Sequence, residues 1–154
     1  MSKRFAVLAL ALLAVSVGVA AGTDDPLYGT WKLNVAKSTW SPGSPYQSEV
    51  AKIEPFGEDG IKWYAEIVSG DGKKNTTQFS ASFDGSEFTQ GGEGTAIMLR
   101  VNRYITERIN KKDGKITTIQ RRTVSKDGKT LTITTVGIDP MGRAISNDMV
   151  FEKQ

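Results

Sequence analysis

The sequence has 154 residues, contains no cysteine and no histidine, and has a net charge of +3. These two absences exclude disulfides, a Ser-His-Asp triad, a cysteine nucleophile, the usual zinc sites and a His-ligated haem. An enzyme on this chain would have to work with carboxylates, Lys, Tyr or Arg alone, and we expect neither a cofactor nor a metal.

The first 21 residues have the pattern of a secretory signal peptide. Lys3 and Arg4 precede an apolar run over residues 5–17, and Val19-Ala20-Ala21 supplies small residues for cleavage. An uncleaved membrane anchor is the alternative, but the run is shorter than the ~20 residues that a span needs. We therefore expect an exported protein, periplasmic or secreted, that does not stay inserted in a membrane. Export without disulfides is typical of bacterial proteins.

Residues 22–154 are expected to form one domain with a core of its own. Because Lys3 and Arg4 leave with the leader, this part has only one basic residue more than it has acidic ones. Nucleic-acid binding is not expected, since it requires a clustered basic face.

The domain is predicted to be all-β, with about ten strands and no segment of helical period. The expected strands cover residues 28–35, 48–55, 61–68, 75–83, 86–90, 95–101, 104–110, 116–124, 130–138 and 144–152. Residues 36–47 are rich in Ser, Pro and Gly and predict a loop, and residues 91–94 predict a flexible link.

A repeated Asp-Gly dipeptide lies between these strands and is the strongest short-range signal for a hairpin. It occurs at Asp59-Gly60, Asp71-Gly72, Asp84-Gly85, Asp113-Gly114 and Asp127-Gly128. Successive hairpins make an antiparallel meander, and a meander of this length avoids exposed edges by closing into an up-and-down barrel.

Alternation along the strands predicts which side chains face the interior. The expected interior positions are Ile61, Trp63, Ala65, Ile67, Phe79, Ala81, Phe83, Ile97, Leu99, Val101, Ile105, Glu107, Ile109, Leu131, Ile133, Ile145, Met149 and Phe151. Among them, we expect Trp63, Phe79, Met149 and Phe151 to line a ligand pocket or to form plain core.

Both ends of the chain resemble the calycins, which include the lipocalins and the fatty-acid-binding proteins. Gly29-Thr30-Trp31 is similar to the Gly-x-Trp start of these families. The segments 113–121, 127–129 and 150–153 resemble the C-terminal half of the fatty-acid-binding proteins. The resemblance implies a barrel that holds a small apolar molecule. It also gives Gly29 and Trp31 a structural role, in which Trp31 plugs the barrel base under a stacked cation.

Two departures from the fatty-acid-binding proteins matter. The loop over 36–47 is too short and too rich in Pro, Gly and Ser for their helical lid. Met149 and Phe151 stand where that family has the Arg and Tyr that bind a carboxylate, and of its inward arginines only one has a counterpart, Arg121.

Arg121 and Arg122 are adjacent, so a regular strand directs only one of them inward. The family resemblance favours Arg121, whereas alternation with Ile116 and Val124 favours Arg122, and a bulge would reconcile the two. An inward Arg needs a partner, and we expect Glu107 on the preceding strand to supply it.

Three functions follow from these observations. The first is an exported carrier of a small hydrophobic or amphipathic molecule, oriented by the inward Arg. The second is a solid barrel that acts through its surface as a structural or protein-interaction module of the cell envelope. The third is an enzyme, such as an isomerase or hydrolase, using Glu107 and an Arg, which no residue spacing singles out.

Overall fold

The computed structural model describes residues 24–43, 46–90 and 94–154. The predicted leader over 1–21 and residues 91–93 of the predicted link lie outside the described residues. No helix of the described part is long and apolar enough to cross a membrane.

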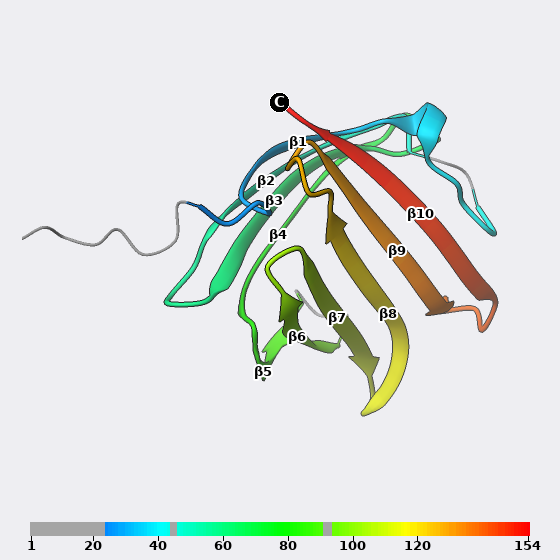
Figure 1. Cartoon of the computed structure of the whole chain (residues 1–154). Helices are drawn as coiled ribbons and strands as arrows, with labels where there is room; N and C mark the ends of the chain where they lie inside the picture. The colour runs from blue at the N-terminus through cyan, green and yellow to red at the C-terminus, as the bar shows by residue number, and fades with distance from the viewer. Residues whose placement is uncertain (1–23, 44–45, 91–93) are drawn as a thin grey trace, which may run out of the picture.

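Ten antiparallel strands follow one another along the chain and curve into a nearly closed barrel, as predicted (Figure 1). They are β1 (Gly29–Leu33), β2 (Ser48–Pro55), β3 (Gly60–Val68), β4 (Lys74–Ser82), β5 (Asp84–Thr89), β6 (Thr95–Asn102), β7 (Ile105–Lys112), β8 (Lys115–Val124), β9 (Thr130–Ile138) and β10 (Ala144–Lys153).

The strand order shows how the barrel closes. β1 pairs with both β2 and β10, so the two ends of the chain lie side by side in one sheet. The order runs β4-β3-β2-β1-β10-β9-β8-β7-β6-β5, and β4 and β5 are its two edges. A seam therefore remains between β4 and β5, where side chains have to take the place of ladder hydrogen bonds.

Three of the five Asp-Gly dipeptides lie wholly in connections between paired strands, and a fourth, Asp59-Gly60, ends the β2–β3 connection with Gly60 as the first residue of β3. Asp113 and Gly114 join β7 to β8 with φ values of 49° and 73°, which is the positive-φ pair that a type I′ turn requires. The prediction was wrong for Asp84-Gly85, which opens β5 at the seam between two unpaired strands. Here the Phe83 amide donates to the carbonyl of Asp59, so the chain is tied to the β2–β3 turn.

The described residues after β1, 34–43 and 46–47, contain no helical lid. It holds a single 3₁₀ turn, η1 (Val35–Lys37), which Asn34 caps by accepting from the Lys37 amide. Thr39 then forms an isolated bridge with Asp148 of β10. The described part of the loop thus runs along β10.

Trp31 lies in the core at the base of the barrel, with no exposed surface. Its indole nitrogen donates to the carbonyl of Leu27 at 2.8 Å, and the Lys153 ammonium lies 5.0 Å from a ring centroid. Trp31 thus lies buried with a cation over its ring, the arrangement that the predicted plug requires. Gly29 permits this arrangement, because a Cβ there would lie 2.7 Å from Cε of Lys153.

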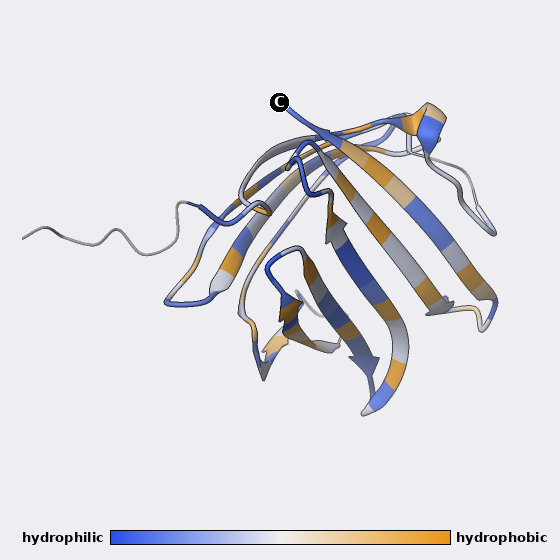
Figure 2. Ribbon diagram, in the orientation of Figure 1, coloured by the Kyte–Doolittle hydropathy of each residue, from blue (hydrophilic) through white to orange (hydrophobic). Residues whose placement is uncertain are grey.

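Apolar and polar residues alternate along the strands (Figure 2), and the predicted inward faces of β3, β4, β9 and β10 are confirmed. The predictions for β6 and β7 were wrong by one residue. Ala96, Met98, Thr106 and Arg108 are buried, whereas Ile97, Leu99, Val101, Ile105, Glu107 and Ile109 lie on the opposite, outer face.

The reason for this reversal is the register with β8. Arg122 and Val124 are buried on β8, and Arg122 lies directly opposite Thr106 on β7. Since opposite residues share a face, Thr106 and Arg108 have to point inward with it. The isoleucines of β7 then face outward, although they are its most apolar residues.

Candidate functional site

Three charged side chains lie inside the barrel. Glu49 of β2, Arg108 of β7 and Arg122 of β8 are 4%, 9% and 2% exposed. They share the interior with two buried hydroxyl residues, Thr106 and Thr135. Buried charge is costly unless it is paired, so this cluster needs a physical explanation.

Arg122 is the least satisfied member of the cluster. Its Nη2 donates to Oε1 of Gln120 at 3.1 Å, and its guanidinium lies 5.4 Å from a ring centroid of Trp63. Its Nε and Nη1 are buried and have no hydrogen-bond partner among the described residues. Burial and the charge of Arg108 lower the pKa of Arg122 to about 9, so it remains a cation at pH 7.

Arg108 lies against an aromatic wall. Trp63, Phe79 and Phe88 stack in sequence, with centroids 6.1 Å and 5.5 Å apart, and the Arg108 guanidinium lies 4.3 Å from the centroid of Phe79. Its Nε donates to Oδ1 of Asn110 at 2.8 Å. Burial lowers the pKa of Arg108 to about 10, which also leaves it charged at pH 7.

A half-open cavity of about 390 Å³ reaches this cluster. Arg108 and Gln120 lie in its wall, and Asn110 links its polar groups by accepting from Gln90 and donating to Thr118. The other wall residues lie at the end of β7, the start of β8, the end of β9 and the start of β10, and in the β9–β10 turn. They are Lys112, Thr117, Ile138, Asp139, Pro140 and Ile145. The cavity therefore presents the Arg108 guanidinium, the charged groups of Lys112 and Asp139, and several neutral hydrogen-bonding groups.

Glu49 is the acidic member of the cluster, and its ionised form reduces the net positive charge of the interior. Burial raises the pKa of its carboxyl to about 7, and the attraction of Arg122 opposes that rise. Tyr46 lies near it, since the charge of Glu49 adds to burial in raising the pKa of the Tyr46 hydroxyl. At neutral pH the interior thus holds two cations and a carboxyl group that is partly protonated.

The structure brings together most of the predicted pocket residues. Trp63 and Phe151 are buried, and Phe79 and Met149 pack against the same core. Arg122 points inward, as alternation predicted and contrary to the family resemblance. A bulge does occur in the β7–β8 pair, between Asn110 and Lys111, but it does not bring Arg121 inside.

The predicted roles of Glu107 and Arg121 inside the barrel are wrong. The two side chains pair with each other on the outer surface, with Nε of Arg121 2.9 Å from Oε1 of Glu107, and Arg121 is 57% exposed. The same register that buries Arg122 turns its neighbour outward, and with it Glu107, which lies opposite Arg121.

The sequence analysis did not predict two members of the cluster, Glu49 and Arg108. Glu49 carried a usable signal, because it alternates in phase with Ala51 and Ile53 on β2. Arg108 carried none, because its strand places isoleucines on the other face.

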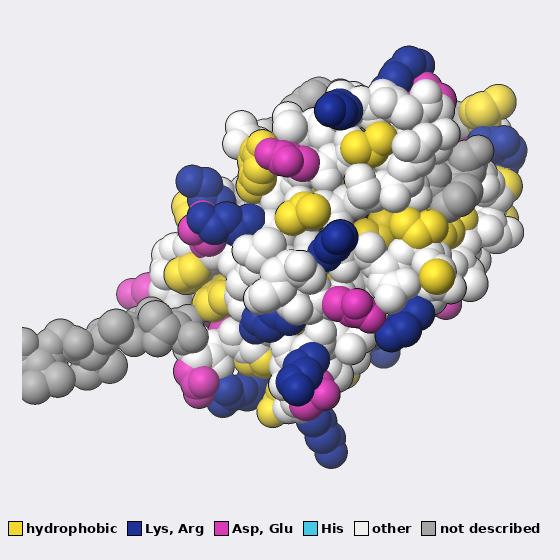
Figure 3. Space-filling model, turned by 90° about the horizontal axis from the view of Figure 1, so that it is seen from above, with side chains coloured by type: hydrophobic (Ala, Val, Ile, Leu, Met, Phe, Trp, Pro, Cys, Tyr) yellow, Lys and Arg dark blue, Asp and Glu magenta, His cyan; other side chains and the backbone are white. Residues whose placement is uncertain are grey.

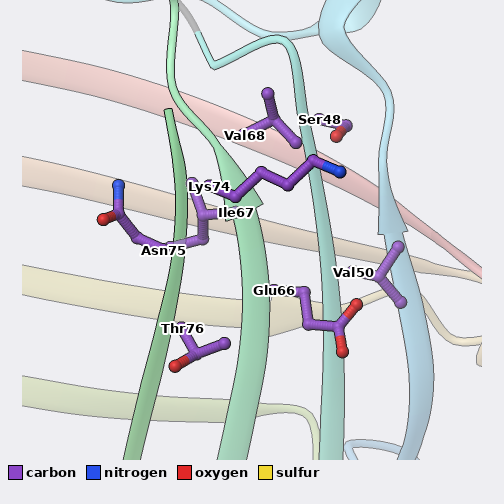
Figure 4. Close-up of a pocket in the computed structure, with 8 residues that line it drawn as sticks. All are labelled: Ser48, Val50, Glu66, Ile67, Val68, Lys74, Asn75 and Thr76. Carbon is purple, nitrogen blue, oxygen red and sulfur yellow. The ribbon is translucent and has the colours of Figure 1, made fainter. Parts of the chain in front are cut away.

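Other depressions of the described surface have a different character. A groove of about 440 Å³ lies mainly on the outer face of β2–β4, where the side chains of Glu66 and Lys74 extend over it (Figure 4). A shallower depression of about 290 Å³ lies at the base beside Asp24 and Lys153. Neither reaches the buried charges, and the described residues contain no cluster of three metal-ligating side chains.

The surface gives no basic patch on the face seen in Figure 3, where Lys and Arg side chains are interspersed with Asp and Glu. Most ion pairs of the described part lie on the surface, such as Lys52 with Glu54 at 2.8 Å.

No protein-family model matches the sequence, and no curated protein matches it. Several solved structures do. A variant of the fluorescent protein UnaG matches with a TM-score of 0.58 and 15% identity, covering 84% of this chain and 96% of that one. Wild-type UnaG matches with a TM-score of 0.53 and 16% identity, over 83% and 97%.

A zebrafish ileal bile acid-binding protein, solved with cholic acid, matches with a TM-score of 0.50 and 15% identity, over 84% of this chain and 99% of that one. These neighbours span nearly their whole length on this chain, and at such low identity they show its fold. The chain therefore has the same antiparallel barrel fold as these neighbours.

Proposed function

We propose that this calycin-type barrel is an exported protein that holds a small amphipathic molecule, with an anionic group of the ligand bound by the interior arginines. The apolar part of the ligand would lie along Trp63, Phe79 and Met149. Polar groups of the cavity wall, such as Asn110 and Thr118, would meet its outer end. This is the carrier function expected from the sequence, and we propose Arg122 as the arginine that orients the ligand.

The observation that carries the proposal is Arg122, whose Nε and Nη1 lack a partner in the described structure. A buried guanidinium with two unused donors is expensive, and an anion is the group that would satisfy both. The cavity supports the proposal through Arg108, which lies in its wall, and its volume of about 390 Å³ is within the range of roughly 300–1,000 Å³ typical of ligand pockets. Arg122 and the aromatic side chains are not part of that wall, so the proposed ligand would have to extend from the cavity into the interior.

Two features of the relatives agree with a carrier. The zebrafish neighbour is a bile acid-binding protein, so a fold of this shape can enclose an anionic amphipath. None of the neighbours described above is named as an enzyme. With no histidine or cysteine in the chain, we propose binding and not catalysis.

Export is proposed from the leader pattern alone. Mass spectrometry of the protein purified from its own host tests it, and the expected N-terminus is Gly22. A mass that still includes residues 1–21 would contradict cleavage, whatever the barrel binds.

Ligand binding is tested by native mass spectrometry of the same preparation, followed by solvent extraction. We expect an added mass that extracts as an anionic amphipath. As a defined probe, anilinonaphthalene sulfonate should bind the wild type and lose at least about tenfold in affinity on Arg122→Met. Nile red, which is uncharged, should bind both forms equally.

The variant should fold, because replacing a poorly paired buried charge by an apolar side chain of similar size is neutral or stabilising. A matched control is Arg121→Met on the outer face of the same strand, which should leave the affinity for both probes unchanged. Equal sulfonate binding by wild type and Arg122→Met would overturn the proposal.

A further inference from the structure

The outer surface of β6–β9 carries apolar side chains in a continuous row. Ile97, Ile109, Ile119 and Val136 lie directly opposite one another on successive strands, and we call them the apolar row. Ile119 and Val136 are 39% and 45% exposed. A water-facing sheet surface normally carries polar side chains, so this row needs a partner.

A second row, which we call the charged row, lies two residues away from the apolar row on the same four strands. Glu107 and Arg121 form its centre, opposite each other on β7 and β8 and joined by an ion pair. Leu99 and Thr134 flank them on β6 and β9. The acid and the base therefore lie on either side of the line between β7 and β8.

We propose that this face binds a second copy of the chain through a two-fold axis that runs parallel to the strands, between β7 and β8. Such an axis places β7 of one copy over β8 of the other, and β6 over β9. Ile109 then faces Ile119, Ile97 faces Val136, and Glu107 faces Arg121 of the other copy. Every central contact is apolar on apolar or acid on base, as an isologous interface requires.

The charged row decides between a second copy and a lipid surface. A membrane that covered the apolar row would also desolvate Glu107 and Arg121 without adding any opposite charge. A second copy adds an acid beside each base and a base beside each acid. The outer wall of a barrel is convex, so the contact is confined to four strands and the dimer should dissociate on dilution.

This inference does not depend on the proposed ligand, because the buried arginines are on the other face of the same strands. Arg122 and Arg108 point inward, whereas their neighbours Arg121 and Ile109 point outward. The dimer would leave the mouth of the barrel free.

Sedimentation velocity of the protein, expressed from the whole chain and studied over a wide concentration range, tests the proposal. We expect a monomer–dimer equilibrium for the wild type. Ile119→Lys should abolish the dimer, whereas Val50→Lys should not. Val50 is a matched control, since it points outward on β2 and is also 39% exposed.

The charged row allows a sharper test. Glu107→Arg and Arg121→Glu should each be monomeric, because each places like charges against one another across the axis. An equimolar mixture of the two variants should form a heterodimer, since the arginine substituted at position 107 then faces the glutamate substituted at position 121. Recovery in the mixture also shows that neither variant is misfolded.

A wild type that stays monomeric at all concentrations would overturn the proposal. A dimer that survives both Ile119→Lys and the single charge reversals would place the interface elsewhere and overturn it too. So would a monomer that sediments with vesicles of phosphatidylcholine and phosphatidylglycerol through Ile119, since the row would then serve a lipid surface.

Discussion

Trp31 closes the base of the barrel by combining three interactions in one side chain. The ring is fully buried, the indole N–H is satisfied by Leu27, and the ammonium of Lys153 covers one ring face. The same ammonium donates to the carbonyl of Pro26 at 3.2 Å, so the last strand is tied to the segment before β1. Removing the ring would leave a cavity and also disconnect these two ends of the chain.

Trp31→Ala should therefore lower the free energy of unfolding by about 3–5 kcal/mol, the usual cost of emptying a buried aromatic site. Urea unfolding followed by far-UV circular dichroism measures it. Phe56→Ala is the control, because Phe56 is 44% exposed in the β2–β3 turn and should cost much less. Equal losses for both variants would contradict the plug.

The three residues of the buried charged cluster differ in how far the sequence alone predicts that they point inward. The sequence leaves Arg121 and Arg122 as two candidates for the inward arginine, and the register of β8 decides for Arg122. Glu49 could have been predicted to point inward, because it alternates in phase with Ala51. Arg108 was not predictable, because the isoleucines of β7 form the more apolar face and hydrophobic patterning assigns that face to the core. Only the pairing with β8 reveals that this wall of the barrel is polar inside.

At the scale of the elements, the strands and their turns were predictable because the signals are local. Asp-Gly turns and two-residue alternation do not depend on distant parts of the chain, and all ten strands appear within a few residues of their expected ranges. The seam between β4 and β5 was not predictable from the Asp84-Gly85 turn. Whether two successive strands pair depends on how the whole barrel closes.

The seam is closed by side chains where the backbone ladder is missing. Phe79 of β4 and Phe88 of β5 stack at 5.5 Å, and Arg108 lies over both rings. These contacts hold the two edge strands together without main-chain hydrogen bonds between them. β4 should consequently be the strand that is most sensitive to loss of the stack.

Phe88→Ala should cost about 2 kcal/mol, less than the ~3–5 kcal/mol of a fully buried phenylalanine, because Phe88 is only partly buried. Hydrogen–deuterium exchange should quicken in β4 while β9 stays protected. Tyr64→Ala on the outer face of β3 is the control, since Tyr64 is 38% exposed and lies outside the stack. Uniform loss of protection in both strands would show that the seam does not open locally.

At the scale of the whole molecule, two parts of the barrel distribute polar and apolar side chains differently between the inner and outer faces. On β2–β4 the outer face is mostly polar and the inner face mostly apolar, whereas β7 and β8 place arginines inside and isoleucines outside. A polar interior and an apolar exterior on one half of a barrel are each costly in isolation. They are consistent with one another if the interior meets an anion and the exterior meets another copy of the chain.

The charge of the interior should appear in the pH dependence of folding. The Glu49 carboxyl has a pKa of about 7 in the barrel and about 4.5 in the unfolded chain. Below pH 4.5 it is neutral in both states and contributes nothing to the slope. Between pH 4.5 and 7 the unfolded state ionises first, so stability falls as the pH rises, and above pH 7 the loss is complete.

This raised pKa predicts a loss of about 3 kcal/mol in the free energy of unfolding across that window. The sequence has no histidine to titrate in this window, and exposed carboxyls such as Asp71 and Glu87 have lowered pKa values, so their effect on stability has the opposite sign and lies mainly below it. Urea unfolding at a series of pH values should show the fall in the wild type and a nearly flat profile in Glu49→Gln. Glu107→Gln, on the outer face, should keep the wild-type slope. If Glu49→Gln also keeps that slope, the Glu49 carboxyl is ionised throughout and the interior is less positive than its burial implies.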